Sequence, residues 1–392
     1  MKNYLLYSFV APFQSKEFGP FSLACLLGTI GFSMAALTYA FDMSSKPMAD
    51  VLIFYITTYG VIGLTIMPMA FMLYTWVRYI IWRRVMVGIT LLPFAMNFIP
   101  VESQLAEGVI LGIIVAPFWV LFHTVMMEIS SSGENEGNSI SLSLNMVSLG
   151  ALLGIGLATL ISTTSLTTHD AANIGAVLNT ISIYLMCKTL RRVRGDMPAI
   201  DPERAFKSAV LGNPRRALIT LVLGVSFVPA SALWPLFIIH AGLSVVATGL
   251  YEVLSSLLRL CVSGHAGRLS DKGFHHAIRV SGLFFAAGKA PWLFAMNTLF
   301  VPFTILVWSV GRHFQMVGLS AMWYKNKTLG GLAALEFLLG IGRIAGLIVF
   351  VPLLFKAPAY FVMASVGVYL LTYIVCLRIQ PPEQVKAEAT KA

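Results

Sequence analysis

The stretch VLIFYITTYGVIGLTIMPMAFMLYT, residues 51–75, contains no charged side chain. A helix of about 20 apolar residues crosses the hydrocarbon core of a bilayer, because each residue adds about 1.5 Å along the axis. The apolar residues form a continuous run and do not alternate with polar ones, which favours a helix over a strand of a membrane barrel. This stretch therefore predicts a membrane-spanning helix.

The composition of the whole chain agrees with that prediction. Of its 392 residues, 57% are hydrophobic and 11% are charged, whereas soluble domains carry about 25% charged residues. The mean hydropathy is +0.81. Such a chain cannot cover its surface with polar groups, so a soluble enzyme, a disordered chain and a disulfide scaffold are excluded. The four cysteines lie in or beside apolar runs without metal-ligand spacing, and we expect no metal or cofactor.

Twelve apolar runs are long enough to be spanning helices. They fall at about 22–42, 51–75, 83–99, 105–127, 139–162, 171–188, 217–239, 243–263, 277–295, 298–322, 329–355 and 357–377. With both termini in the cytoplasm, almost every basic loop residue lies inside, and only Lys46 and Lys356 lie outside. Basic residues favour cytoplasmic loops, so this asymmetry supports the topology. It also accounts for the net charge of +10 without nucleic-acid binding.

The longest internal polar stretch, residues 188–216, divides six predicted helices from six. We therefore predict an all-α protein of two pseudo-symmetric six-helix bundles, a layout typical of transporters built from repeated halves. The predicted parts are an interfacial segment, an N-terminal bundle, a basic cytoplasmic linker, a C-terminal bundle and a cytoplasmic tail, at residues 1–21, 22–187, 188–216, 217–378 and 379–392.

The segment after the eighth predicted helix reads GHAGRLSDKG, residues 264–273, and is interpreted as a loop. It resembles the signature loop of the major facilitator superfamily, in which an aspartate follows a glycine by four residues and precedes a basic residue. The resemblance implies a gating latch made of Gly267, Arg268, Asp271 and Lys272. The copy that this family carries after the second helix is absent from residues 76–84.

Charged residues inside spanning helices are costly and indicate function. Glu252 precedes Arg259 by seven residues, and Glu336 precedes Arg343 by the same spacing. Seven residues are two helical turns, about 10 Å, so we expect no direct bond within either pair. Lys289 is expected to extend to the outer interface, and Trp234 to be an interface anchor.

The resemblance implies that the first, fourth, seventh and tenth helices line a central cavity. Arg312 lies near the middle of the tenth helix, where a guanidinium can bind a carboxylate or phosphate through two hydrogen bonds. We predict that Arg312 contacts substrate, with His123, Trp119 and Arg343 as further candidates. Glu252, Glu336 and His313 are the predicted proton-coupling residues, and Glu252 is preferred because it lies nearest the middle of the membrane.

The sequence thus predicts a monomeric secondary transporter, not an enzyme, in a bacterial inner membrane. It would move a small anionic or zwitterionic solute by alternating access. Two alternatives remain at this stage. One is an exporter or flippase of amphipathic molecules, with which the 18 methionines and 12% aromatic residues are compatible. The other is a transporter-like receptor or assembly protein that moves nothing.

Overall fold

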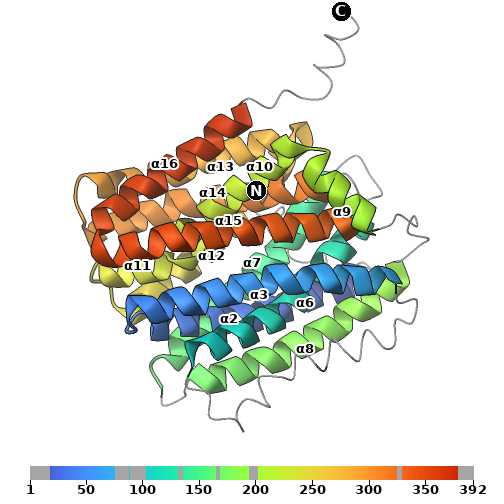
Figure 1. Cartoon of the computed structure of the whole chain (residues 1–392). Helices are drawn as coiled ribbons and strands as arrows, with labels where there is room; N and C mark the ends of the chain where they lie inside the picture. The colour runs from blue at the N-terminus through green and yellow to red at the C-terminus, as the bar shows by residue number, and fades with distance from the viewer. Residues whose placement is uncertain are drawn as a thin grey trace, which may run out of the picture.

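The computed structural model describes residues 18–75, 88, 103–130, 136–164, 168–193, 202–324 and 329–377, and every regular element among them is helical. The helices lie in two layers with roughly parallel axes (Figure 1). Helices from the first half of the chain, drawn in blue to green, form one layer. Most of those from the second half, drawn in yellow to red, form the other. The predicted all-α fold of two halves agrees with this arrangement.

Five helices are described in the first half. They are α2 (Phe18–Met43), α3 (Met48–Thr75), α6 (Gln104–Ser130), α7 (Glu136–Ile161) and α8 (Thr168–Val193). Each overlaps a predicted apolar run and begins one to four residues before it. The predicted run 83–99 lies outside the described residues, apart from Gly88.

The predicted linker contains a short helix, α9 (Pro202–Leu211), and the second half begins at α10 (Pro214–Phe227). Pro202 and Pro214 each occupy a first helical position, where the missing N–H costs nothing. The remaining long helices are α12 (Val245–Lys272), α13 (Phe274–Lys289), α14 (Val301–Tyr324), α15 (Leu329–Lys356) and α16 (Pro358–Leu377). Two short 3₁₀ segments, Ala290–Leu293 and Thr298–Phe300, join α13 to α14.

Eight helices in the described part of the chain are long and apolar enough to cross a membrane. They include α2, α3, α6 and α7 in the first half and α10, α12, α15 and α16 in the second. The predicted count of twelve spans and the cytoplasmic position of both termini stay predictions.

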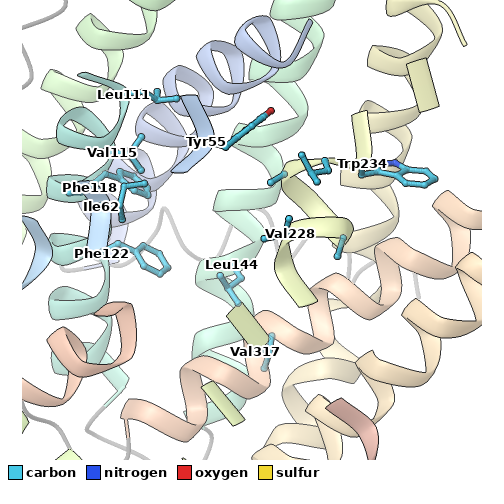
Figure 2. Close-up of a cluster of buried hydrophobic side chains, with 14 of the residues drawn as sticks. Tyr55, Ile62, Leu111, Val115, Phe118, Phe122, Leu144, Val228, Trp234 and Val317 are labelled. Carbon is cyan, nitrogen blue, oxygen red and sulfur yellow. The ribbon is translucent and has the colours of Figure 1, made fainter. Parts of the chain in front are cut away.

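The two halves meet along two helix pairs, α7 with α12 and α3 with α15. In Figure 1, α15 runs beside α3 at the boundary between the layers. Glycines permit this approach: a Cβ added to Gly340 of α15 would lie 3.3 Å from the Cα atom of Gly63 on α3. Small residues at such crossings bring backbones close, which strengthens dispersion contacts where lipid gives no hydrophobic driving force. The core cluster of buried side chains likewise includes residues from both halves (Figure 2).

Glycines also hold each half together, in equivalent places. Gly150 and Gly154 of α7 face the backbone of α2, and Gly342 and Gly346 of α15 face α10. The fifth predicted helix thus packs on the first, as the eleventh packs on the seventh. The sequences around these glycines, LGALLGIG at residues 149–156 and LGIGRIAG at 339–346, are also alike, which supports an internal repeat.

Replacing Gly342 by valine is expected to lower the free energy of unfolding by about 2–3 kcal/mol, because overpacking against rigid backbone is costly. An added Cβ would collide with the carbonyl oxygen of Leu221 on α10. Thermal denaturation in detergent measures the change. The matched control is Gly156→Val, since a Cβ there meets nothing within 4 Å. Equal melting temperatures for the two variants would contradict the packing role.

The seventh predicted helix is interrupted. A π-helical segment, Val228–Ala232, follows α10 and leads to α11 (Trp234–His240). The Leu233 N–H donates to the carbonyl oxygen of Val228 at 2.9 Å, a separation of five residues. Pro229 and Pro235 lack the N–H groups that a regular ladder requires, which accounts for the irregularity. The segment lies between Phe227, which lines the central cavity, and the buried Trp234.

Candidate functional site

A cavity of about 180 Å³ lies between the two halves. Its walls come from α2, α3, α6 and α7 on one side and α10, α12, α14 and α15 on the other. Polar and apolar side chains both reach it, which is typical of a ligand site.

The first-half wall is aromatic and carries no Asp, Glu, Lys or Arg among the lining residues described. Tyr55 and Tyr59 are one turn apart on α3, and their rings are nearly parallel at 6.3 Å between centroids. On α6, the rings of Trp119 and His123 stack at 5.7 Å, again because residues four apart share a face. This wall offers flat rings and little formal charge.

The second-half wall carries three arginines, Arg259, Arg312 and Arg343, each on a different helix. Arg312 is partly exposed to the cavity. Its backbone is positioned by the preceding Gly311, which packs closely on α13. The Arg312 guanidinium lies over the Trp308 ring at 5.3 Å. No hydrogen bond or ion pair from this guanidinium to the described residues is formed, so it can receive a ligand.

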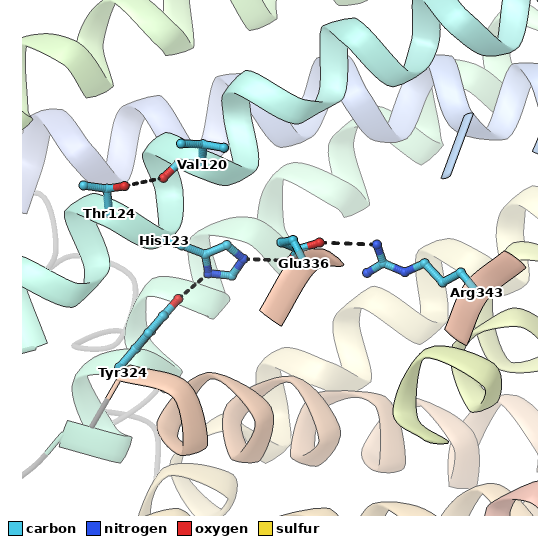
Figure 3. A network of polar contacts seen from close by, with 6 residues as sticks. All are labelled: Val120, His123, Thr124, Tyr324, Glu336 and Arg343. Carbon is cyan, nitrogen blue, oxygen red and sulfur yellow. Dashed lines mark hydrogen bonds and ion pairs between the residues drawn. The ribbon is translucent and has the colours of Figure 1, made fainter. Parts of the chain in front are cut away.

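Arg343 and Glu336 do form an ion pair, Nη1 to Oε2 at 3.4 Å. The prediction that residues seven apart cannot bond was wrong, because two long side chains together reach across two turns. The other oxygen of Glu336 accepts from Nε2 of His123 on α6 at 3.2 Å, and Nδ1 of His123 lies 2.6 Å from the Tyr324 hydroxyl on α14 (Figure 3). All of these groups are largely buried. The network therefore joins the two halves beside the cavity.

Arg259 and Glu252 form no such pair. The Arg259 guanidinium donates to the Ser256 hydroxyl and, at 3.4 Å, to the Ser255 carbonyl oxygen. Glu252 is buried and does not line the cavity, but it is close enough to Arg312 and Arg259 to interact with them electrostatically. Its Oε1 atom has no hydrogen-bond partner in the described chain.

His313 faces away from Arg312, as the helical step of about 100° predicts. Its Nε2 atom lies 3.4 Å from the hydroxyl of Ser141 on α7, and that hydroxyl donates to the Ser263 carbonyl oxygen on α12 at 2.5 Å. His313 thus joins three helices at the edge of the cavity.

The predicted gating loop is helical. Residues 264–272 continue α12, and the chain turns only at Gly273, whose φ of +149° suits glycine. Gly267 is buried within the helix, whereas Arg268, Asp271 and Lys272 are exposed on its last turns. The interpretation as a loop was wrong, because the polar residues and the two glycines of this segment are compatible with a helix inside a folded bundle. The latch role of the four residues stays a prediction.

Lys289 and Trp234 also differ from expectation. Both side chains are 0% exposed, so neither reaches an interface. The Lys289 ammonium lies over the rings of Trp234 and Phe237, at 4.0 and 4.2 Å, and over Phe361 at 5.2 Å. Its Nζ atom has no hydrogen-bond partner within the described ranges. The rings hold the cation by cation–π attraction.

Replacing Lys289 by methionine is expected to raise the melting temperature. Burying an ammonium without a carboxylate costs several kcal/mol, whereas cation–π contacts return about 2 kcal/mol. Methionine fills similar space and also packs well on aromatic rings. Lys356→Met, at an exposed position, is the matched control. A lower melting temperature for Lys289→Met would mean that the aromatic cage stabilises the cation beyond its desolvation cost.

The structure thus brings six of the predicted residues together at one cavity, and Glu252 is not among its lining residues. The six are Arg312, His123, Trp119, Arg343, Glu336 and His313. Sequence reasoning missed Tyr324, Tyr55 and Tyr59. The tyrosine pair at i and i+4 on α3 is a signal that marks one helix face. Tyr324 carries no such signal, because its partner is 201 residues away in the chain.

No protein-family model matches this sequence, and a search of curated proteins finds no match. Solved structures do match. The human organic anion transporter MFSD10 (TETRAN) superposes with a TM-score of 0.68 at 14% identity, covering 91% of this chain and 98% of that one. The nucleoside transporter NupG superposes with a TM-score of 0.66 at 14% identity, covering 93% of this chain and 99% of that one. A bacterial homologue of the iron transporter ferroportin, in an outward-facing state, superposes with a TM-score of 0.65 at 16% identity. The match covers 93% of this chain and 99% of that one.

These neighbours are transporters and not enzymes, and they span nearly the whole chain. The apolar helices are long enough for a bilayer. The chain is therefore a multi-pass membrane protein with the fold of the major facilitator superfamily of transporters.

Proposed function

We propose that this protein is a secondary transporter that moves a small organic anion or zwitterion across the membrane by alternating access. The observation that carries the proposal is Arg312, whose guanidinium is uncommitted and partly open to a cavity between the halves. In a low-dielectric site such a group favours a carboxylate or phosphate strongly. Trp119, His123 and Arg343 complete the contacts. The organic anions named for MFSD10 are compatible with this substrate class.

Alternating access requires the halves to part on one side of the site and close on the other. His123 and Glu336 join α6 to α15, so this contact must break when the halves part there. We therefore favour Glu336 among the proton-coupling candidates, because a proton on its carboxylate weakens both of its contacts. Glu252 and His313 are the other candidates. The latch of Gly267, Arg268, Asp271 and Lys272 belongs to the same proposal.

The proposed setting is a bacterial inner membrane, with both termini in the cytoplasm and the protein working as a monomer. A second candidate function is the export or flipping of an amphipathic molecule, which the aromatic wall of Tyr55, Tyr59 and Trp119 favours. A receptor or assembly role without flux is the third.

Purified protein in liposomes separates these functions. We expect uptake of radiolabelled organic acids, accelerated by the same unlabelled acid inside the vesicles, and none for matched amines. An inward proton gradient tests the coupling. Flipping of a fluorescent lipid without uptake of acids would favour the second candidate. If the protein transports neither organic acids nor lipid, and circular dichroism shows that the ligand-free protein is folded, the transport proposal fails.

A further inference from the structure

The charges around the cavity do not balance. Three arginines, Arg259, Arg312 and Arg343, face two carboxylates, those of Glu336 and Glu252. Both ring nitrogens of His123 have partners, since Nε2 lies 3.2 Å from Glu336 and Nδ1 lies 2.6 Å from the Tyr324 hydroxyl. His313 is likewise satisfied by donating to Ser141. Counted over its arginine and glutamate side chains alone, the described site has one more cation than anions.

One of the three arginines differs from the others in its contacts. Arg343 is neutralised by its ion pair with Glu336. Arg259 is held by two serines, and Glu252 acts on both it and Arg312. Only the Arg312 guanidinium is left without a hydrogen-bonding partner in the part of the chain described. Because uncompensated charge is costly inside a membrane, a ligand that brings one negative charge makes the loaded site neutral. A ligand with two would leave it negative.

The opposite wall constrains the rest of the ligand. The rings of Tyr55 and Tyr59 are inclined by only 12° to each other, and Trp119 and His123 are inclined by 27°. Phe32 meets the edge of Trp119 at 82°. Flat faces of this kind bind a planar ring better than a puckered one, by roughly 2- to 10-fold in affinity.

We propose that the substrate is a monoanion with an aromatic ring, held with its acid group on Arg312 and its ring against Tyr55, Tyr59 and Trp119. This rests on the proposed transport function and narrows its substrate class. The two parts, one charge and one flat ring, come from different walls of the cavity and can be tested separately.

The test is equilibrium binding to the detergent-purified full chain at pH 7.5, with benzoate, cyclohexanecarboxylate, phthalate and benzamide. We expect benzoate to bind most tightly. Cyclohexanecarboxylate, which has the same charge but no aromatic ring, should bind roughly 2- to 10-fold more weakly. Phthalate, with two charges, should bind at least about 10-fold more weakly, and neutral benzamide should not compete.

Tyr59→Leu locates the ring site. It should bring the benzoate-to-cyclohexanecarboxylate ratio towards one while both acids still bind. Tyr360→Leu, on an exposed face of α16, should leave the ratio unchanged. Melting curves without ligand show whether each variant is folded. If Tyr59→Leu does not fold, the ratio of benzoate to cyclohexanecarboxylate affinity in the wild-type protein tests the aromatic part of the inference.

Two results overturn the inference without touching the proposed function. If phthalate binds as tightly as benzoate, the inference of a single negative charge is refuted. If benzoate and cyclohexanecarboxylate bind equally, the inference of an aromatic ring is refuted. If liposomes transport another organic anion but none of these acids binds, the inference is also wrong. Absence of both binding and anion flux removes the proposed function together with it.

Discussion

Replacing Arg312 by glutamine is expected to weaken binding of an anionic ligand by about 30- to 5000-fold. Removing one partner of a buried charge pair costs about 2–5 kcal/mol, which corresponds to that range. Glutamine keeps a polar tip of similar reach but carries no charge and no guanidinium fork. The other arginines cannot substitute, because Arg343 is paired with Glu336 and Arg259 with two serines. Equilibrium binding and initial uptake rates in liposomes measure the loss.

Arg312→Lys separates charge from geometry. A lysine retains the charge but binds a carboxylate as a point and not through a fork, so we expect an intermediate loss. Arg215→Gln, at an exposed position near the start of α10, removes the same charge outside the cavity. It should change neither the binding affinity for the anion nor the initial uptake rate. Unchanged anion binding in Arg312→Gln would assign the anion site elsewhere.

The second large effect concerns stability. Glu336→Leu should lower the free energy of unfolding by about 3–5 kcal/mol, the range measured when one partner of a buried ion pair is removed. The change leaves the Arg343 guanidinium buried without an anion and also removes the acceptor of His123. Thermal denaturation in detergent reports the shift.

Two further variants make that result interpretable. Glu336→Leu combined with Arg343→Leu removes both charges, so much of the lost stability should return. Glu203→Leu breaks a shorter ion pair, 2.7 Å to Lys207, whose side chains are 63% and 66% exposed. Exposed pairs contribute about 0–1 kcal/mol, so this variant should melt close to the wild-type protein. A similar loss in Glu203→Leu and Glu336→Leu would refute the importance of burial.

The long apolar runs predicted the described helices well, because in a bilayer the length of a spanning helix is set by the solvent. Helix ends were harder. Residues 264–272 are mostly polar, with two glycines, and in isolation resemble a loop, but they continue α12, and four of them are buried. The π-helical break at Val228–Ala232 was also beyond the sequence, since prolines mark a distortion without defining its type.

For the site, the chemistry of single residues was more predictable than their partners. A charge inside an apolar run identifies Arg312 without any structure. Whether that charge is free is a different question, which depends on contacts between distant segments. Glu336 illustrates the limit, because its contact with His123 crosses 213 residues. Lys289 shows the same limit in reverse, since no spacing rule indicates that three rings from other helices enclose it.

The excess of arginines over carboxylates at the cavity has a further consequence, which concerns the membrane potential. The three arginines and two glutamates at the site leave one formal positive charge in excess, which the proposed monoanion would cancel. A membrane potential acts on moving charge with about 2.3 kcal/mol per elementary charge for each 100 mV. In the proposed transport cycle, the potential would therefore act on the reorientation of the empty protein and leave the loaded step nearly unaffected. In such a carrier the electrical work of the cycle is done during the return, when nothing is being carried.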